Sequence, residues 1–464
     1  MTQVPASAAR VAVVGGGLAG LAAGCALADA GLRVTLFEKR PFLGGRASSY
    51  EHPGTGEVVD NCQHVLLGCC TNLVDFYRRI GVENKIRWYE RLTFLEPGGR
   101  RSEIFPSWLP APFHGVPSFL QASWLCRREK LAIARAMASL VKGVPLDTQE
   151  SFFSWLERHG QPKRAIDRFW KVVLVSALNE DLDRMSVHYA AQVFRESFLK
   201  APEGGRMGVP RVPLSELYTA AADYIRVRGG EVRLRTAVDS FRADTAQVRV
   251  CASGSELSAD FAVLAVPFDI LEPLLPQTTA WEPLRAALSR FEMSPITGIH
   301  FWFDRQITDL DHAVLLDRTI QWMFHKSKLL GRESSGCYVE LVVSASRSLV
   351  EKSKTEILAL AQRELAEFFP AAGEAQLVKA TVIKEVHATY SALPEADLYR
   401  PRATTVWPRV FLAGDWTATG WPATMEGAVR SGYFAAETIA RSIGLANRFL
   451  IRDLRARGFM RLFG

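Results

Sequence analysis

The sequence RVAVVGGGLAGLAAGCALADAGLRVTLFE, residues 10–38, decides the fold. Its first five residues form a short apolar run that predicts a buried strand. A helix fits residues 18–30 because Gly31 ends the apolar pattern, and residues 33–37 predict a second strand. Between the first strand and the helix, three glycines stand in the spacing GxGxxG. This strand–helix–strand unit predicts an α/β lobe that binds a dinucleotide.

The glycines of the turn predict contact with a phosphate group. Gly15 permits the tight turn, Gly17 lets a pyrophosphate approach the helix N-terminus, and Gly20 lets the helix pack on the strand. Glu38 ends the second strand, where a carboxylate accepts hydrogen bonds from an adenosine ribose and repels a 2′-phosphate. The predicted contacts of the dinucleotide in this region are Gly15, Gly17, Leu18, Ala19, Gly20, Glu38 and Lys39.

A second glycine pair follows the second strand, in the segment KRPFLGGR at residues 39–46. Gly44 and Gly45 allow the backbone to lie against a ligand, and the guanidinium of Arg46 offers a planar fork for phosphate oxygens. This continuation favours FAD over NAD as the dinucleotide.

The segment VFLAGDWTATGWPATMEGA, residues 410–428, supports the same interpretation from the other end of the chain. It predicts an apolar strand that ends in Gly-Asp, followed by a helix to about residue 439. Asp415 is placed to hold a ribityl hydroxyl, and the positive end of the helix near Thr424 would stabilise an anionic reduced flavin. The predicted FAD contacts here are Gly414, Asp415, Ala423, Thr424 and Met425.

Together these motifs resemble the FAD-dependent amine oxidase and phytoene desaturase superfamily. Within it, residues 60–68, DNCQHVLLG, and 414–422, GDWTATGWP, are most similar to the hydroxysqualene dehydroxylases of bacterial hopanoid synthesis, also called squalene-associated FAD-dependent desaturases. The resemblance runs from about residue 11 to residue 440, and Cys62 stands where that family more often has Gly. It implies a Rossmann-like FAD-binding lobe with a discontinuous α+β substrate lobe.

The resemblance also implies a reaction, the reductive dehydroxylation of the C30 allylic alcohol hydroxysqualene to squalene. Segment 60–64 runs back toward the flavin in that fold, so we nominate His64 as a proton donor and Gln63 as the residue that holds the departing oxygen. A packing histidine is the alternative for His64. In the superfamily, the residue matching Val238 touches the adenine, and an ordinary strand valine is the alternative there.

FAD is expected to bind without a covalent bond. No Cys follows Cys337 and no His follows His387, so the C-terminal flavin motif offers neither usual anchor. The electron donor that would reduce the flavin is not identified by the sequence.

The nucleotide features are interrupted along the chain, which predicts two lobes that are each discontinuous in sequence. Residues 296–303, 320–325 and 337–343 alternate between polar and apolar side chains, which predicts an antiparallel sheet in the second lobe. We assign 1–84, 203–286 and 401–445 to the FAD-binding domain, 85–202 and 287–400 to a substrate and membrane-facing domain, and 446–464 to a basic tail.

Two segments suggest contact with a membrane surface. Aromatic residues between 105 and 124 are followed by Arg127, Arg128 and Lys130, a pattern that suits a lipid headgroup layer. The last 24 residues hold six Arg and one Asp, a net +5, and Arg448, Arg452 and Arg455 would share one face of a short helix. A proline-braced loop packed on its own lobe is the alternative for the aromatic segment.

Composition narrows the remaining possibilities. A net charge of +7 over 464 residues does not suggest nucleic acid, and the nine His form no metal-ligand spacing. Seven Cys without a CxxC pair fit a reducing compartment. The 18 uncharged residues at 11–28 contain five Gly that fit the dinucleotide turn better than a membrane span or signal peptide. We therefore expect a cytoplasmic protein bound peripherally to the inner face of the cell membrane.

Two other interpretations of the same fold stay open. One is an oxidative flavoenzyme, such as a polyene desaturase or an amine oxidase, because the flavin motifs alone do not fix the direction of the reaction. The other is a non-enzymatic lipid-binding escort, like the Rab escort and GDP-dissociation-inhibitor proteins. In each interpretation that involves isoprenoids, the ligand is an apolar chain whose binding rests on burial, at roughly 0.8 kcal/mol per CH₂ group.

Overall fold

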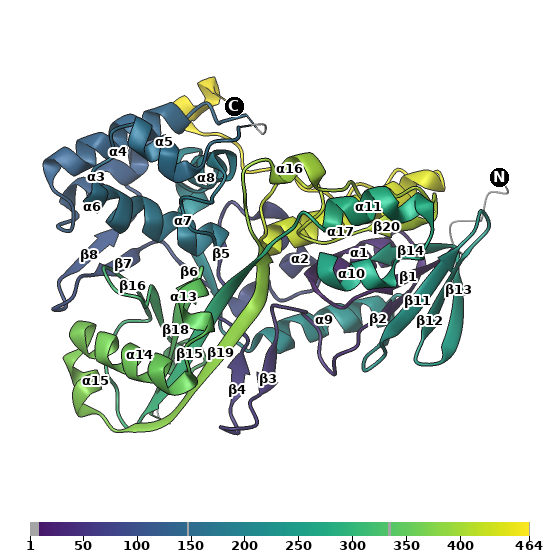
Figure 1. Cartoon of the computed structure of the whole chain (residues 1–464), viewed down its shortest axis with the longest axis horizontal. Helices are drawn as coiled ribbons and strands as arrows, with labels where there is room; N and C mark the ends of the chain where they lie inside the picture. The colour runs from purple at the N-terminus through teal and green to yellow at the C-terminus, as the bar shows by residue number, and fades with distance from the viewer. Residues whose placement is uncertain (1–8, 146–147, 333–335, 464) are drawn as a thin grey trace.

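The computed structural model describes residues 9–145, 148–332 and 336–463, which form two lobes side by side. The lobe on the right in Figure 1 is built on a parallel sheet, and the lobe on the left combines a larger mixed sheet with a group of helices. The two halves of the predicted α/β fold are therefore present.

The sheet of the first lobe has five parallel strands in the order β10-β2-β1-β14-β20. The glycine-rich turn follows the central strand, and helix α1 (Leu18–Asp29) ends one residue earlier than predicted. The strands are β1 (Arg10–Val14), β2 (Arg33–Phe37), β10 (Glu231–Arg233), β14 (Phe261–Leu264) and β20 (Val410–Leu412).

Both faces of this sheet are covered, as a parallel sheet requires. Val11 and Val13 of β1 belong to the core formed with α1, α9 (Leu214–Val227) and α17 (Met425–Ser442). Ala12 and Val14 point the other way, toward the core of an antiparallel meander. The meander strands are β11 (Val238–Ala243), β12 (Val248–Ala252) and β13 (Ser255–Ala259).

The second lobe contains a seven-stranded sheet in the order β19-β15-β18-β17-β16-β7-β8. β15, β17 and β18 are antiparallel, as predicted, and the β16–β7 pair is parallel. The strands are β7 (Leu92–Leu95), β8 (Arg101–Ile104), β15 (Met293–Phe303), β16 (His312–Leu315), β17 (Trp322–His325), β18 (Cys337–Ser344) and β19 (Leu377–Tyr390).

The two faces of this sheet have different neighbours. Ile299, Phe301 and Leu341 lie in the core that also contains side chains of α14 (Lys354–Phe368). The alternate positions, such as Val342 and Phe324, pack against Cys62 and its neighbours from the first lobe. The predicted alternation of side chains thus separates a face that packs within the second lobe from a face that packs against the first lobe.

The helical part of the second lobe lies above the sheet in Figure 1. Its helices share a core rich in aromatic rings, which includes Trp124, Trp155 and Trp170. They are α3 (Val116–Gln121), α4 (Arg127–Leu140), α5 (Phe152–Arg158), α6 (Lys163–Ala165), α7 (Lys171–Leu178), which continues a π-helical turn at Ile166–Trp170, and α8 (Val187–Phe194).

One strand pairing crosses a predicted boundary. β6 (Ile86–Tyr89) lies inside the range assigned to the substrate domain, but it pairs with β9 (Met207–Pro210), which lies in the range assigned to the FAD-binding domain. Strands from both assigned ranges therefore share one small hydrogen-bonded sheet, which β5 (Leu66–Leu67) completes.

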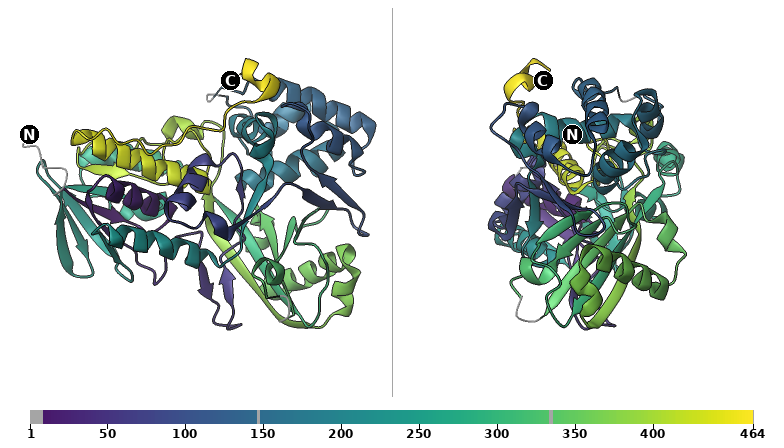
Figure 2. Two further views of the ribbon diagram at one scale, coloured as in Figure 1. Left: turned by 180° about the vertical axis from the view of Figure 1, so that it is seen from behind. Right: turned by 90° about the vertical axis from the view of Figure 1, so that its left-hand side faces the viewer.

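The C-terminal tail does not form the expected amphipathic helix. Residues 445–457 run without regular structure, and only Gly458–Leu462 form a short 3₁₀ helix. Their backbone groups are instead satisfied by other segments, as where Ile451 exchanges two hydrogen bonds with the side chain of Asn72. Figure 2 shows the tail, in yellow, crossing from α17 to the helical region of the second lobe.

Candidate active site

A cavity of about 510 Å³ lies at the carboxyl ends of β1 and β2 and extends to the face of the second lobe. It is lined by every residue predicted to bind FAD except Gly20, and also by Gln63 and His64. The predicted residues that line it are Gly15, Gly17, Leu18, Ala19, Glu38, Lys39, Gly44, Gly45, Arg46, Val238, Gly414, Asp415, Ala423, Thr424 and Met425.

The glycines of the turn fit a bound pyrophosphate. Gly15 has φ of +109°, a conformation that L-residues rarely adopt, so only glycine makes this turn without strain. A Cβ at Gly20 would lie 1.9 Å from the carbonyl oxygen of Gly15, which explains why Gly20 packs the turn rather than lining the cavity. A Cβ at Gly17 would have no atom closer than 3.9 Å, so the space above it is open to a ligand.

Glu38 is held firmly at the end of β2. Its two carboxylate oxygens accept hydrogen bonds from the backbone amides of Gly16 and Arg40, each at 2.8 Å. The side chain is buried but still borders the cavity, and each oxygen keeps a second lone pair for a ribose hydroxyl. The predicted position of the adenosine end is therefore consistent with the geometry.

Arg46 and Asp415 depart from the predicted arrangement because they contact each other. The guanidinium of Arg46 donates to Asp415 Oδ1 at 2.6 Å and to the carbonyl oxygen of Ala388 at 3.0 Å. The sequence predicted a phosphate partner for Arg46 and a ribityl hydroxyl for Asp415. The physical reason for the difference is that two opposite charges in a partly buried site stabilise each other.

Helix α17 presents its N-terminus to the cavity, as predicted. The side chain of Thr424 caps the helix by accepting a hydrogen bond from the amide of Gly427 at 3.1 Å. Both Thr424 and Met425 line the cavity, so the positive end of an 18-residue helix faces the ligand space.

His64 lies in the wall of the cavity with a defined protonation pattern. Its Nδ1 is 2.7 Å from the carbonyl oxygen of Cys62. Because a carbonyl oxygen only accepts hydrogen bonds, Nδ1 carries the proton and Nε2 is the acceptor of the neutral ring. Burial lowers the pKa of His64 below its ordinary value, and the hydrogen bond to Cys62 opposes that shift only in part.

The side chain of Gln63 is already engaged. Its Nε2 donates to the carbonyl oxygen of His64 at 3.0 Å, and its Oε1 accepts from Lys326 Nζ at 2.8 Å. The predicted catalytic roles of His64 and Gln63 stay predictions, and the geometry favours His64 as the group that meets a substrate.

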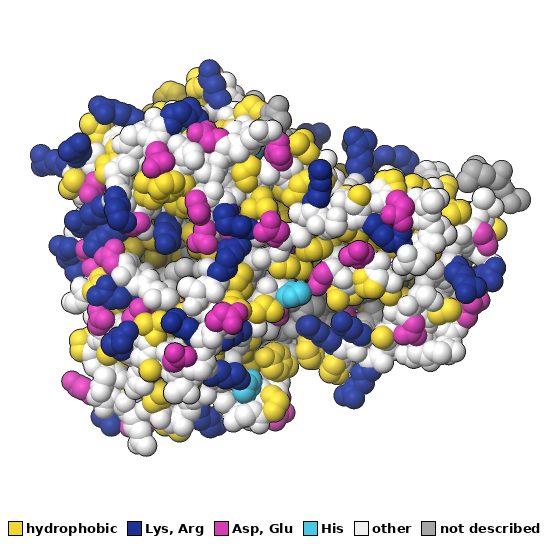
Figure 3. Space-filling model, viewed as in Figure 1, with side chains coloured by type: hydrophobic (Ala, Val, Ile, Leu, Met, Phe, Trp, Pro, Cys, Tyr) yellow, Lys and Arg dark blue, Asp and Glu magenta, His cyan; other side chains and the backbone are white. Residues whose placement is uncertain are grey.

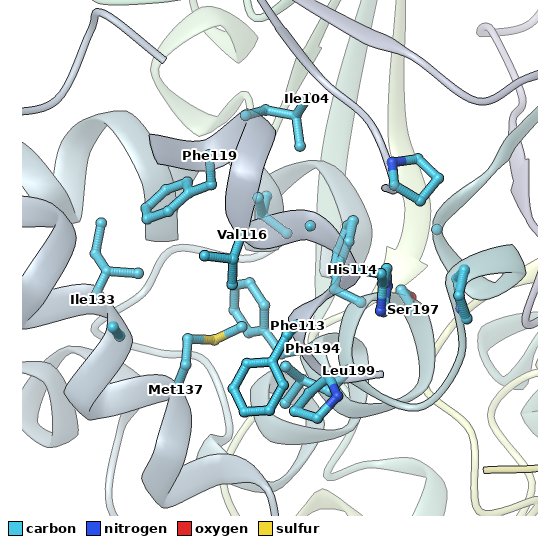
Figure 4. Close-up of a pocket in the computed structure, with 18 of the residues that line it drawn as sticks. Ile104, Phe113, His114, Val116, Phe119, Ile133, Met137, Phe194, Ser197 and Leu199 are labelled. Atoms are coloured by element: carbon cyan, nitrogen blue, oxygen red, sulfur yellow. The ribbon is translucent and has the colours of Figure 1, made fainter. Parts of the chain in front are cut away.

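A second and larger cavity, of about 1010 Å³, lies within the helical part of the second lobe. Figure 4 shows aromatic and aliphatic side chains arranged around it, among them Phe119, Ile133 and Met137. One helical stretch connects the two cavities, since Phe169 and Val173 line the larger cavity while Ser176 and Ala177 line the smaller one. A long apolar molecule in the larger cavity would thus lie beside the wall of the smaller one, which is called the flavin cavity below.

Several lining residues of the flavin cavity were not predicted from the sequence. Most of them come from segments distant in the chain, and no local motif marks them. A weak signal exists for Asn179, which ends an apolar helix with φ of +52° and whose side chain donates to Ser294 O and Thr389 Oγ1. The unpredicted polar residues are Arg40, Asn61, Ser176, Asn179, Thr236, Asp269, Glu385, His387 and Thr389.

Comparison with known proteins agrees with this geometry. The family described as flavin-containing amine oxidoreductase matches residues 18–440. The 15-cis-phytoene desaturase of Synechococcus elongatus is 29% identical over 96% of this chain and 99% of its own length. A probable zeta-carotene desaturase of the same organism is 26% identical over 94% of this chain and 100% of its own length.

The fold is also found among solved structures. Wild-type putrescine oxidase bound to putrescine has a TM-score of 0.72 at 17% identity, covering 94% of this chain and 99% of that protein. The match supports the predicted two-lobe α/β architecture. Because the family match spans most of the chain, it confirms the predicted class, an FAD-dependent oxidoreductase, over the non-enzymatic escort, and it does not single out the hydroxysqualene dehydroxylases. The chain belongs to the family of flavin-containing amine oxidoreductases, and it is an FAD-dependent oxidoreductase.

Proposed function

We propose that this protein is an FAD-dependent desaturase of a long, acyclic isoprenoid chain. The observation that carries the proposal is the apolar cavity of about 1010 Å³ that shares the helical stretch 166–178 with the flavin cavity. A substrate without charged groups can be held there by burial alone, at roughly 0.8 kcal/mol per CH₂ group. The relatives named as phytoene and zeta-carotene desaturases support the same substrate class.

Desaturation removes two hydrogens from neighbouring carbons, one as a hydride and the other as a proton. When bound, FAD supplies the two-electron acceptor that takes the hydride. His64 presents an unprotonated Nε2 at the cavity, and burial keeps its pKa below the ordinary value, so the ring is neutral at neutral pH. A neutral imidazole with a free acceptor is suited to take up the proton.

A second candidate is the reductive dehydroxylation of hydroxysqualene to squalene. The observation that favours it is the resemblance of residues 60–68 and 414–422 to hydroxysqualene dehydroxylases. This reaction needs the opposite protonation state, because a hydroxyl group leaves readily only after it gains a proton. The lowered pKa of His64 and the names of the reported relatives both favour the oxidative reaction.

One pair of anaerobic incubations distinguishes the two candidates. The oxidised protein is mixed with phytoene, and the dithionite-reduced protein is mixed with hydroxysqualene, each in detergent micelles. Desaturation predicts bleaching of the flavin absorbance near 450 nm and a product with a longer conjugated system in the first mixture only. Reoxidation of the flavin with formation of squalene in the second mixture only would establish dehydroxylation instead.

We also propose that the rim of the apolar cavity rests on the cytoplasmic face of the cell membrane. Five large hydrophobic residues line the cavity and are also exposed to solvent at the surface, which places them at its opening. They are Phe113, Val116, Phe459, Leu462 and Phe463. Two segments far apart in the sequence meet here, since the rings of Phe113 and Phe459 are in edge contact and the amide of Phe459 donates to Ala111 O.

Basic residues lie beside this opening, since Lys142 lines the cavity and Arg461 stands between Phe459 and Leu462 in the chain. Figure 3 shows Lys and Arg side chains gathered over the helical region at the left-hand end of the molecule, with hydrophobic side chains between them. Exposed Trp108 and Leu120 extend the apolar surface beside the rim. An apolar patch with positive charge beside it suits an anionic lipid surface, from which an isoprenoid could pass into the cavity. No helix in the described residues is long and apolar enough to cross a membrane.

Vesicle binding tests this second proposal. The protein should bind vesicles that contain anionic lipid, more weakly as salt rises, because surface charge is screened within about 10 Å at 0.1 M salt. Replacing Phe459 and Leu462 by Ser should weaken binding, whereas Val227→Ser, at an exposed valine on α9, should not. Equal binding of all variants to neutral and anionic vesicles would contradict the proposal.

A further inference from the structure

A buried charged cluster lies directly behind His64. Lys326 is only 3% exposed, and its Nζ donates to Asp60 Oδ2 at 2.6 Å and to Gln63 Oε1 at 2.8 Å. Glu340 Oε2 lies farther away, at 3.6 Å. Asp60 and Gln63 belong to the first lobe, whereas Lys326, at the start of α12 (Lys326–Leu329), and Glu340, on β18, belong to the second. The cluster therefore links the two lobes at the flavin cavity.

The hydrogen bonds and the burial of these side chains decide which of them carry a charge. Asp60 also accepts hydrogen bonds from Ser49 Oγ at 2.5 Å and from the amide of Leu214 at 3.4 Å. These donors, with Lys326, hold the pKa of Asp60 below its ordinary value although burial opposes them. Burial raises the pKa of Glu340 to about 8, so Glu340 is mostly neutral at neutral pH. Asp60 and Lys326 thus form one ion pair, and the remaining donor of Lys326 is available to Gln63.

In the hydrogen bonds between Lys326, Gln63 and His64, the donor and the acceptor of each bond are fixed by chemistry. An ammonium group only donates, so the atom of Gln63 that faces it must be Oε1. The amide nitrogen of Gln63 must then face the carbonyl oxygen of His64, at 3.0 Å. The backbone of His64 is fixed by this contact while its ring donates from Nδ1 to Cys62 O. The contact with Cys62 O sets the tautomer and leaves Nε2 as the acceptor of the ring, while the contacts of Lys326 and Gln63 fix the backbone from which the ring projects.

We infer that Lys326 is a positioning residue, which acts through Gln63 to fix the backbone of residues 63–64, so that the His64 ring keeps its hydrogen bond to Cys62 O and its Nε2 stays the acceptor. The inference rests on the proposed function, in which His64 receives the proton of the substrate. It gives a role to the buried ion pair of Lys326 and Asp60, which the contacts predicted for FAD do not explain. Lys326 itself does not line the flavin cavity and has no contact with the reacting atoms.

The test uses a double variant, because removing one charge alone would leave its partner buried and unpaired. Lys326→Met combined with Asp60→Asn removes both charges and keeps the side-chain sizes. Lys326 and Asp60 shift the pKa of His64 in opposite directions, so their joint loss leaves little net electrostatic effect on the ring. The matched control is Lys328→Met, two residues along α12, whose Nζ contacts Asp309 O and Asp311 away from the cavity.

Two measurements on the FAD-loaded proteins decide the outcome. Histidine ¹⁵N resonances, assigned to His64 by difference from His64→Phe, report which ring nitrogen carries the proton. Stopped-flow reduction of the flavin by phytoene separates the limiting rate from the KM. In the double variant the Nδ1-protonated form should lose its dominance, and the limiting rate should fall by about tenfold or more with a smaller change in KM. The Lys328→Met control should match the wild type in both.

The possible results separate the inference from the proposed function. An unchanged His64 tautomer in a folded, FAD-loaded double variant would overturn the inference. A tautomer shift in a protein whose flavin no polyene reduces would uphold the positioning role of Lys326 and overturn the desaturase proposal. If the double variant does not fold, Gln63→Leu, which removes only the relay between Lys326 and His64, should give the same tautomer shift.

Discussion

The two cavities of this protein are built in different ways. The flavin cavity is made of backbone at tight turns and of a few polar side chains, and its positive-φ glycines Gly15, Gly44 and Gly45 bring the chain close to the ligand space. The larger cavity is made almost wholly of apolar side chains on helices. One cavity is therefore specific for a defined molecule, and the other accepts a class of molecules by size and apolarity.

This difference means that substitutions should separate the two functions. Changes at the flavin cavity act on a fixed geometry and should be nearly all-or-none. Changes at the apolar cavity act on buried area and should be graded. The following predictions test that contrast.

Gly17→Val is expected to have the largest effect. The added side chain meets no protein atom closer than 3.9 Å at its Cβ, so the fold should tolerate it, but the side chain occupies the space that the pyrophosphate needs. The purified variant should be colourless, as measured by the ratio of absorbance at 450 and 280 nm. Gly373→Val is the control, because Gly373 is exposed, has no positive φ, and an added Cβ there would come no closer than 3.6 Å to another atom. Full flavin content in Gly17→Val would remove the pyrophosphate from this turn.

His64→Phe should keep its FAD and lose roughly 10²- to 10⁴-fold in the limiting rate, the range expected for one acid–base group. The pH dependence gives the direction of the reaction. Burial lowers the pKa of His64, and the charged neighbours of the ring are Asp60, Lys326 and Arg46. The ring therefore stays neutral until the pH falls below the ordinary pKa of a histidine. If His64 is a base, the wild-type rate should fall as the pH drops through this pKa. A rate that rises on acidification would identify His64 as a proton donor instead.

Met137→Trp should have an intermediate effect that is confined to the substrate. Met137 lines the apolar cavity, and a larger ring there removes space at a cost of about 1–3 kcal/mol, or roughly 5- to 150-fold in kcat/KM. FAD content should stay at the wild-type level. Arg135→Trp adds the same ring to the exposed face of α4 and should change neither quantity. Loss of FAD in Met137→Trp would show that the cavities are not independent.

Glu340→Gln should have the smallest effect on the reaction, because it changes stability rather than the binding of either ligand. Because burial raises the pKa of Glu340 to about 8, its contribution to folding is full at low pH and is lost as the pH rises through that value. Wild-type stability should therefore fall relative to Glu340→Gln between about pH 5 and 8, by at most about 1.4 kcal/mol per pH unit. The titratable groups around it are Lys326, Asp60, His300, Cys62 and Tyr338. The unfolding free energies of both proteins are measured with urea at each pH. A constant difference between them over this pH range would contradict the raised pKa of Glu340.

The contrast between the cavities also explains what the sequence could predict. A dinucleotide turn needs glycine where the backbone or its packing admits no side chain, so the predicted turn at Gly15 and the predicted close packing at Gly20 are both found, and the pyrophosphate contact of Gly17 stays a prediction. The helix at residue 425 was predicted for the same reason, since its cap and its preceding strand are local features. Residues that line the apolar cavity obey no spacing rule, and the aromatic residues between 105 and 124, several of which line it, were predicted to meet a lipid headgroup layer instead.

Long-range pairs were the part that sequence patterns could not reach. The contact between Arg46 and Asp415 joins residues 369 positions apart, and that between Lys326 and Asp60 joins residues 266 apart. The tail illustrates the same limit. The spacing of its basic residues predicted a helix, but in the structure its backbone forms hydrogen bonds with Asn72 and Ala111 instead. Charge spacing alone does not reveal such competing partners.

The path of the tail has a practical consequence for handling the protein. The backbone oxygen of Phe463 accepts a hydrogen bond from Arg195, and Met460 is buried against Ala111 and Leu199, so the C-terminus is seated at the rim of the apolar cavity. β1, by contrast, begins at Arg10 in the other lobe (Figure 1). An affinity tag joined to the C-terminus would crowd the opening through which a substrate or a detergent molecule passes. Purification and assay should therefore use a cleavable tag at the N-terminus.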